Sequence, residues 1–177
     1  MEVRRPLVGV APLLSAALLL AASSLAAQSP APAAAPPSPV PALAVGDVVT
    51  SFQAHSYASE TPLYTIDFPK DGPTTVLLIF LSTCPHCHKM IPVWNKALEK
   101  KPQNLKVLGI MLDEGSPGFF ANFKILFPVL RPAMPTELGK QLKLRTVPMT
   151  IRIKPGGVVE GVAVSDADAD KVPGLMR

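Results

Sequence analysis

The stretch 74-TTVLLIFLSTCPHC-87 contains the only two cysteines of the 177-residue chain, Cys84 and Cys87, directly after an uncharged run of strand-forming residues. A short apolar run of this composition is typical of a central β-strand that is buried on both faces. Pro85 suits the first turn of a helix, and the residues that follow up to about Lys100 have an amphipathic pattern. The stretch therefore predicts a strand, then a turn that carries two thiols, then a helix.

The two thiols have the spacing that disulfide exchange requires. In this chemistry one thiolate attacks a disulfide, and a second thiol resolves the mixed disulfide that forms. Cys84 would lie at the start of the helix, where unpaired N–H groups and the helix dipole favour an anion. His86 can add positive charge or a hydrogen bond at the same sulfur, whereas His88 is expected to face solvent and Trp94 to pack in the core. The chain has no other thiol, so a framework of structural disulfides does not explain the pair.

The remaining sequence alternates between strand and helix patterns. Strands are expected at residues 105–112, 129–130, 149–153 and 158–161, and helices at 116–127 and 136–142. Strand 149–153 alternates as if one side were exposed, and the Lys-Pro-Gly-Gly turn at 154–157 predicts a hairpin with the next strand. Residues 166–177 leave room for only a short final helix. We therefore expect an α/β fold with a central mixed β-sheet flanked by helices.

The N-terminal residues have the pattern of an export signal followed by a spacer. Arg4 and Arg5 precede an apolar stretch and then small residues, so residues 1–27 are expected to be a signal peptide or a membrane anchor. Residues 28–42 are rich in proline and alanine and predict an extended linker. The folded domain is expected over residues 43–177. The formal net charge of +4 is mild and gives no reason to expect nucleic acid as a partner.

The chain resembles the thioredoxin superfamily over roughly residues 43–165. The resemblance rests on 84-CPHC-87, which follows a strand, and on 146-TVP-148, which directly precedes a hairpin strand. It implies a thioredoxin-like fold and the activity of a thiol–disulfide oxidoreductase, with no metal and no cofactor.

The resemblance also implies residue roles. Cys84 and Cys87 would be the catalytic residues. Pro85 and His86 would tune the redox potential, and Val147 and Pro148 would bind the substrate. The peptide bond before Pro148 is expected to be cis, which costs little more than trans before a proline. Val147 would then offer backbone hydrogen bonds to the substrate chain.

Within the superfamily, the long spacing from the dithiol to Pro148 and the opening 45-VGD-47 with Phe52 are similar to the TlpA/ResA-like branch. That branch generally reduces its partners, which implies an exported reductase in the bacterial periplasm or at the outer face of the cytoplasmic membrane. Its partners would be protein thiols and disulfides and a membrane-bound electron donor, and its N-terminal segment could serve as a membrane tether. The Pro85-His86 dipeptide is of the DsbA type and favours oxidation instead, so the redox direction stays open.

One departure concerns the acid–base chemistry. Thioredoxin and DsbA carry a buried carboxylate six residues before the first cysteine, and this chain has Leu78 there. A carboxylate at that place can assist proton transfer at the buried sulfur. Glu60, Asp67 and Asp71 are the remaining candidates, and all are remote in sequence.

Other functions are also compatible with the motif. The sequence 84-CPHCH-88 satisfies the attachment pattern of c-type haem, with His88 and Met134 as conceivable iron ligands. The apolar strand before the motif and the hairpin after Pro148 argue against a small helical cytochrome. The four thiol and imidazole residues lie too close together in sequence for one tetrahedral zinc site. A peroxidase and a binding module with a structural disulfide are further alternatives.

Overall fold

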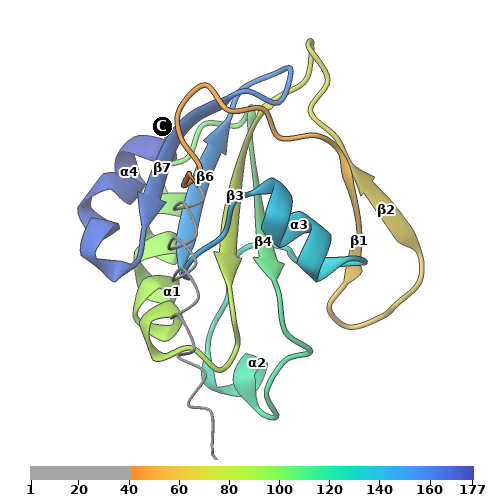
Figure 1. Cartoon of the computed structure of the whole chain (residues 1–177). Helices are drawn as coiled ribbons and strands as arrows, with labels where there is room; N and C mark the ends of the chain where they lie inside the picture. Colours follow the sequence, from red (N-terminus) through yellow and green to blue (C-terminus); the bar gives the residue numbers. More distant parts are fainter. Residues whose placement is uncertain (1–40) are drawn as a thin grey trace, which may run out of the picture. The chain divides into compact units, whose positions relative to one another are not determined.

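The computed structural model describes residues 41–177 (Figure 1). The expected signal peptide or anchor at residues 1–27 and nearly all of the expected linker at 28–42 lie outside the described residues, and both assignments stay predictions. Within the described part, no helix is long and apolar enough to cross a lipid bilayer.

A seven-stranded mixed β-sheet forms the centre of the domain (Figure 1). Its strands are β1 (Phe52–Ser56), β2 (Leu63–Ile66), β3 (Thr74–Phe80), β4 (Leu105–Met111), β5 (Val129–Pro132), β6 (Met149–Ile153) and β7 (Val159–Val164). Their order across the sheet is β2-β1-β5-β4-β3-β6-β7. The neighbours β3, β4 and β5 are parallel, whereas the other pairings are antiparallel. The expected mixed sheet is confirmed.

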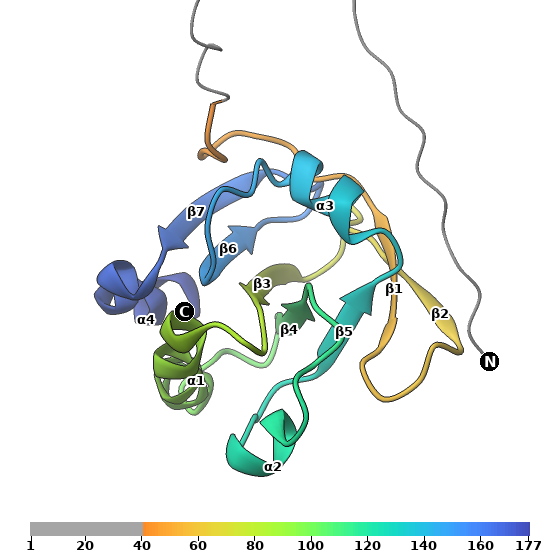
Figure 2. The ribbon, with the colours of Figure 1, turned by 60° about the horizontal axis from the view of Figure 1, so that its bottom comes forward.

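Helices cover both faces of the sheet. The helix α1 (Pro85–Leu98) and the C-terminal α4 (Val172–Leu175) lie on one face, and α3 (Pro135–Gln141) lies on the other (Figure 2). A 3₁₀ segment, η1 (Asp166–Lys171), leads into α4 and contacts α1. The short helix expected over residues 166–177 is thus present as η1 and α4.

The strand β3 is buried on both faces, as its composition predicts. Val76 and Leu78 point into the core under α1, whereas Leu77 and Ile79 point into the core under α3. All four side chains have no solvent exposure. Each buried aliphatic side chain stabilises the fold by about 1.5–3 kcal/mol, so this strand fixes the position of the turn that follows it.

The prediction of a helix over residues 116–127 is wrong. Only α2 (Phe119–Asn122), about one turn, forms there, because Gly118 before it adopts a left-handed conformation (φ 76°). The side chain of Asn95 on α1 forms hydrogen bonds with the backbone that follows α2. It accepts a hydrogen bond from the Leu126 N–H at 3.1 Å and donates one to the Lys124 carbonyl at 2.6 Å. These contacts take the place of helical hydrogen bonds.

The expectation of one exposed side for β6 is also wrong. Thr150, on the side expected to be open, is 1% exposed because Trp94 of α1 covers it. The Trp94 indole N–H donates a hydrogen bond to the Thr150 hydroxyl at 2.9 Å. Trp94 itself has no exposure, which confirms its predicted place in the core.

The hairpin formed by β1 and β2 is absent from the sequence predictions. Both strands are short, and Leu63 and Tyr64 of β2 remain exposed. Without an apolar face of regular period, such a segment gives no strong strand pattern. The hairpin joins the sheet through β1, which pairs with β5.

Gly109, in the middle of β4, should not tolerate a side chain. A Cβ atom at this position would lie 2.6 Å from the ring of Phe127 and 3.2 Å from the ring of Phe80. We expect Gly109→Ala to lower the free energy of unfolding by about 1–3 kcal/mol, the usual cost of an overpacked core. Gly139→Ala in α3 is the matched control, because its Cβ would meet no atom within 4 Å. We expect it to be neutral or to stabilise by up to about 1 kcal/mol. Urea unfolding of both variants measures the difference, and equal effects would contradict the packing argument.

Candidate active site

Cys84 and Cys87 lie at the junction between β3 and α1. Cys84 is the N-cap residue of α1, with an extended backbone (φ −88°, ψ 116°), and Pro85 occupies the first turn. Cys84 is partly exposed, Cys87 is fully buried, and both are free thiols. The partial positive charge of the helix end favours a thiolate at Cys84.

The buried thiol of Cys87 is a very weak acid. Burial is the main cause that raises the pKa of Cys87, to about 12. The hydrogen bond with Cys84, the charge of Cys84 and the charge of Asp113 raise this pKa further, whereas a backbone hydrogen bond at Leu81 lowers it. Cys87 therefore keeps its proton at neutral pH. Of the two thiols, only Cys84 is accessible to a partner.

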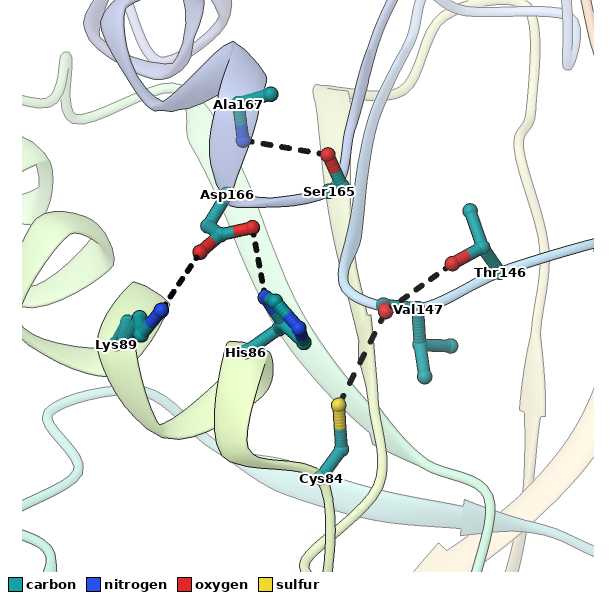
Figure 3. A network of polar contacts seen from close by, with 8 residues as sticks. All are labelled: Cys84, His86, Lys89, Thr146, Val147, Ser165, Asp166 and Ala167. Atoms are coloured by element: carbon teal, nitrogen blue, oxygen red, sulfur yellow. Dashed lines mark hydrogen bonds and ion pairs between the residues drawn. The ribbon is translucent and has the colours of Figure 1, made fainter.

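The loop Thr146–Pro148 lies next to Cys84 (Figure 3). Its Val147–Pro148 peptide bond is cis, as the resemblance implies. The Cys84 thiol donates a weak hydrogen bond to the Val147 carbonyl, with an S···O distance of 3.9 Å. On the other side, the Pro148 carbonyl accepts a hydrogen bond from the Ser165 N–H at 2.8 Å. The loop is thus held between the accessible thiol and the end of β7.

Asp113 belongs to the site, although it has no site role in the sequence predictions. It follows β4, and because β3 and β4 are parallel, the ends of both strands meet at one edge of the sheet. The two carboxylate oxygens accept hydrogen bonds from the Ser82 N–H at 3.0 and 2.9 Å, and one also accepts from the Ser82 hydroxyl at 2.7 Å. The Ser82 hydroxyl oxygen in turn accepts from the Ser116 N–H at 2.6 Å. An acidic residue directly after the strand expected at residues 105–112 is the signal that could have identified it.

Asp113 also supplies the negative charge that the sequence lacks at Leu78. Leu78 is fully buried among apolar side chains. Asp113 approaches the dithiol from the adjacent strand instead, and its charge contributes to the raised pKa of Cys87. The sequence-remote Glu60, Asp67 and Asp71 are therefore not needed to place a carboxylate near the buried sulfur.

The prediction that His88 faces solvent is wrong. Its Nε2 forms a hydrogen bond of 2.7 Å with the Ser82 carbonyl, so Nε2 carries the proton and donates. Its ring packs against Phe123 and Phe119, with centroid distances of 4.4 and 5.8 Å. His88 thus supports the turn after β3. Across residues 41–177, no group of three or more His, Cys, Asp or Glu side chains is arranged to hold a metal ion.

His86 points away from the core, toward the C-terminal segment (Figure 3). Its Nδ1 lies 2.9 Å from a carboxylate oxygen of Asp166, the first residue of η1. Lys89, one turn further along α1, contacts the other oxygen of the same carboxylate at 3.4 Å. The sequence predictions include His86 but give no role to Asp166.

Comparison with known proteins identifies the fold. No family model and no curated protein matches the sequence. Among solved structures, a thiol:disulfide interchange protein, DsbE, from Chlorobium tepidum has a TM-score of 0.59 at 21% identity, covering 76% of this chain and 96% of its own. The thioredoxin domain of a thiol-disulfide oxidoreductase from Bacteroides vulgatus has a TM-score of 0.62 at 14% identity, covering 77% and 100%. StoA from Bacillus subtilis has a TM-score of 0.54 at 20% identity, covering 78% and 98%. The chain therefore has a thioredoxin-like fold.

Asp113→Asn should loosen the turn that precedes the dithiol. The variant replaces a charged acceptor of several hydrogen bonds, so we expect the free energy of unfolding to fall by about 1–3 kcal/mol. It should also lower the pKa of Cys87, because one of the charges that raise this pKa is removed. Urea unfolding measures the first effect, and the pH dependence of alkylation in a Cys84→Ser background measures the second.

The neighbouring acid provides the control for this prediction. Glu114 is 93% exposed, and its one ion pair, with Arg131, is 3.4 Å long. Glu114→Gln should therefore change the stability by less than about 0.5 kcal/mol. Equal stability losses in the two variants would show that Asp113 has no special part in the turn.

Proposed function

We propose that the protein is an exported thiol–disulfide oxidoreductase, most simply a reductase, in which Cys84 and Cys87 exchange a dithiol for a disulfide with partner proteins. The observation that carries the proposal is the asymmetry of the two thiols. Cys84 is accessible at a helix N-terminus and contacts the Val147 carbonyl, whereas burial raises the pKa of Cys87 to about 12. Cys84 is therefore suited to attack a partner disulfide, and Cys87 to resolve the mixed disulfide afterwards.

The reductive reaction proceeds in two exchanges. The Cys84 thiolate attacks one sulfur of a partner disulfide, the partner's S–S bond breaks, and its other sulfur leaves as a thiolate. Cys87 then loses its proton and attacks the Cys84 sulfur, and the second partner thiolate leaves. The partner has gained two electrons, and the protein holds a Cys84–Cys87 disulfide.

The first exchange prepares the second thiol. Two of the causes that raise the pKa of Cys87 are the charge of Cys84 and its hydrogen bond. Both are lost when Cys84 becomes part of the mixed disulfide, so the pKa of Cys87 falls at the moment when its thiolate is needed. A buried resolving thiol is thereby kept inactive until a partner is attached.

The substrate chain binds along the Thr146–Pro148 loop in this proposal. The Val147 carbonyl already accepts a hydrogen bond from Cys84, so an extended peptide that pairs with this backbone would bring its sulfur to the same thiol. Pro85 and His86, between the two cysteines, would tune the redox potential. The substrate class is therefore protein thiols and disulfides.

The location and the electron donor rest on the sequence. The expected signal peptide or anchor at residues 1–27 and the linker at 28–42 support the bacterial periplasm or the outer face of the cytoplasmic membrane. There, a membrane-bound donor would return electrons to the Cys84–Cys87 disulfide, and the N-terminal segment could tether the domain. Among the similar structures, one is an exposed lipoprotein thioredoxin from Streptococcus pneumoniae and another is a secreted disulfide oxidoreductase from Mycobacterium tuberculosis.

The haem alternative fits the site less well. An axial histidine must offer a free ring nitrogen to the iron. The Nε2 of His88 instead carries a proton and donates it to the Ser82 carbonyl, so this nitrogen is not open to an iron, and the ring packs against Phe123 and Phe119. Absorbance of the purified protein near 400 nm, with a matching covalent mass increase, would revive this alternative.

The cysteine variants test the division of roles. Cys84→Ser should abolish insulin reduction, and its remaining thiol should react with iodoacetamide at neutral pH at least about 100-fold more slowly than an ordinary thiol with a pKa of about 8.5. Cys87→Ser should keep the fast thiol and accumulate mixed disulfides with partners. Reaction rates come from mass spectrometry of alkylated protein. Full insulin reduction by Cys84→Ser would overturn the mechanism, as would equal reactivity of the two thiols.

His86→Pro should make the couple more reducing. Removing the histidine removes a side chain that can support the thiolate, and hence the reduced form, by positive charge or a hydrogen bond, so we expect the reduction potential to fall by about 30 mV or more, a tenfold change in the equilibrium constant. Thiol trapping in glutathione buffers measures the potential. His55→Gln, at a histidine in β1, is the control and should leave the potential unchanged. An unchanged potential in His86→Pro would remove the tuning role of His86.

A further inference from the structure

A chain of polar contacts joins the C-terminal segment to the dithiol motif (Figure 3). Asp166, the first residue of η1, accepts a hydrogen bond from Nδ1 of His86 at 2.9 Å and pairs with Lys89 at 3.4 Å. The side chain of Asp166 is 27% exposed and that of His86 is 59% exposed. One half-buried carboxylate therefore holds two side chains from the first turns of α1.

The backbone before Asp166 is held in an unfavourable conformation. Ser165 has a φ of 60°, in the left-handed region that residues other than glycine rarely adopt. Two hydrogen bonds hold it there: its N–H donates to the Pro148 carbonyl at 2.8 Å, and its hydroxyl oxygen accepts from the Ala167 N–H at 3.2 Å. The sharp turn after β7 thus places Asp166 opposite His86 and fixes it to the cis-proline loop.

The contact decides which imidazole nitrogen carries a proton. The hydrogen bond from His86 is the largest cause that lowers the pKa of Asp166, so the carboxylate is ionised and can only accept. Nδ1 must therefore carry the hydrogen that the carboxylate accepts. In general, an anion beside an imidazole supports its positive charge. Positive charge within the dithiol motif stabilises a thiolate and hence the reduced form.

We propose that Asp166 is a positioning residue for His86, which it holds as the Nδ1–H tautomer, and that it thereby raises the reduction potential of the Cys84–Cys87 couple. The inference rests on the proposed function and assigns the tuning of that couple to the C-terminal segment. The negative charge of Asp166 acts in the opposite direction on a thiolate at Cys84. Lys89 offsets this charge because it pairs with the same carboxylate, so the effect through His86 should prevail.

The test compares potentials in a double-mutant cycle on the full chain. Asp166→Asn is nearly isosteric, removes the charge and keeps one acceptor oxygen for His86. We expect it to make the couple two- to fivefold less oxidising in its equilibrium with glutathione, about 10–20 mV at 29.6 mV per tenfold change. In a His86→Gln background the same substitution should have no such effect. Asp166→Glu, which keeps the charge, should recover part of the potential of the unmodified protein.

Asp170→Asn is the matched charge control, because Asp170 lies in the same η1 segment and forms no ion pair or side-chain hydrogen bond within the described residues. It should leave the potential unchanged. An unchanged potential in Asp166→Asn would overturn the proposal, as would a decrease that persists without His86 or an equal decrease in Asp170→Asn. An increase in potential would show that the direct charge effect prevails, and would overturn it too.

A measurement on the unmodified protein makes the test independent of whether the variants fold. Long-range ¹H–¹⁵N spectra distinguish the two neutral tautomers of a histidine, and we expect Nδ1–H for His86. The Nε2–H tautomer would overturn the proposal. These results are separable from the proposed function, because disulfide exchange by Cys84 would persist in every Asp166 variant even if the potential did not change.

Discussion

The burial of β3 on both faces is the constraint on which the site depends. Its side chains enter two separate cores, so the strand can neither slide nor turn, and the chain that leaves it reaches the start of α1 at a fixed point. Asp113 then fixes the intervening turn by accepting hydrogen bonds from Ser82. Because β3 and β4 are parallel, a carboxylate that follows one strand can hold the turn that follows the other. The accessibility of Cys84 and the burial of Cys87 both result from this placement.

Two sulfurs on one helical turn acquire different chemistry through their surroundings. Burial keeps Cys87 protonated, whereas Cys84 lies at the helix end, whose partial positive charge favours an anion. The ionisable side chains His86, Lys89 and Asp166 gather at the rim of the site, where they lie partly in solvent. Charge at the rim can adjust the redox potential without the large desolvation cost of a buried ion pair.

The sequence was sufficient for the features that depend on local pattern. The apolar run, the dithiol and the amphipathic residues after it predict β3 and α1, and the turn at 154–157 predicts the last hairpin. The features it missed depend on residues far apart: Asp113 lies 31 positions from Ser82, and Asp166 lies 80 positions from His86. The prediction of a helix at 116–127 is wrong for the same reason. The regular spacing of the phenylalanines suggests a helix, but the distant side chain of Asn95 on α1 forms hydrogen bonds with the backbone there instead.

The position of Trp94 gives the molecule a built-in optical probe. It is the sole tryptophan of the chain, and it lies in the same core cluster as Cys87, with its indole N–H bonded to Thr150. The long-wavelength fluorescence of the folded protein therefore comes from a single ring between the redox helix and the sheet. Any repacking of α1 that accompanies oxidation or reduction changes the surroundings of this ring. We expect the emission spectrum to report such repacking directly, with no label attached.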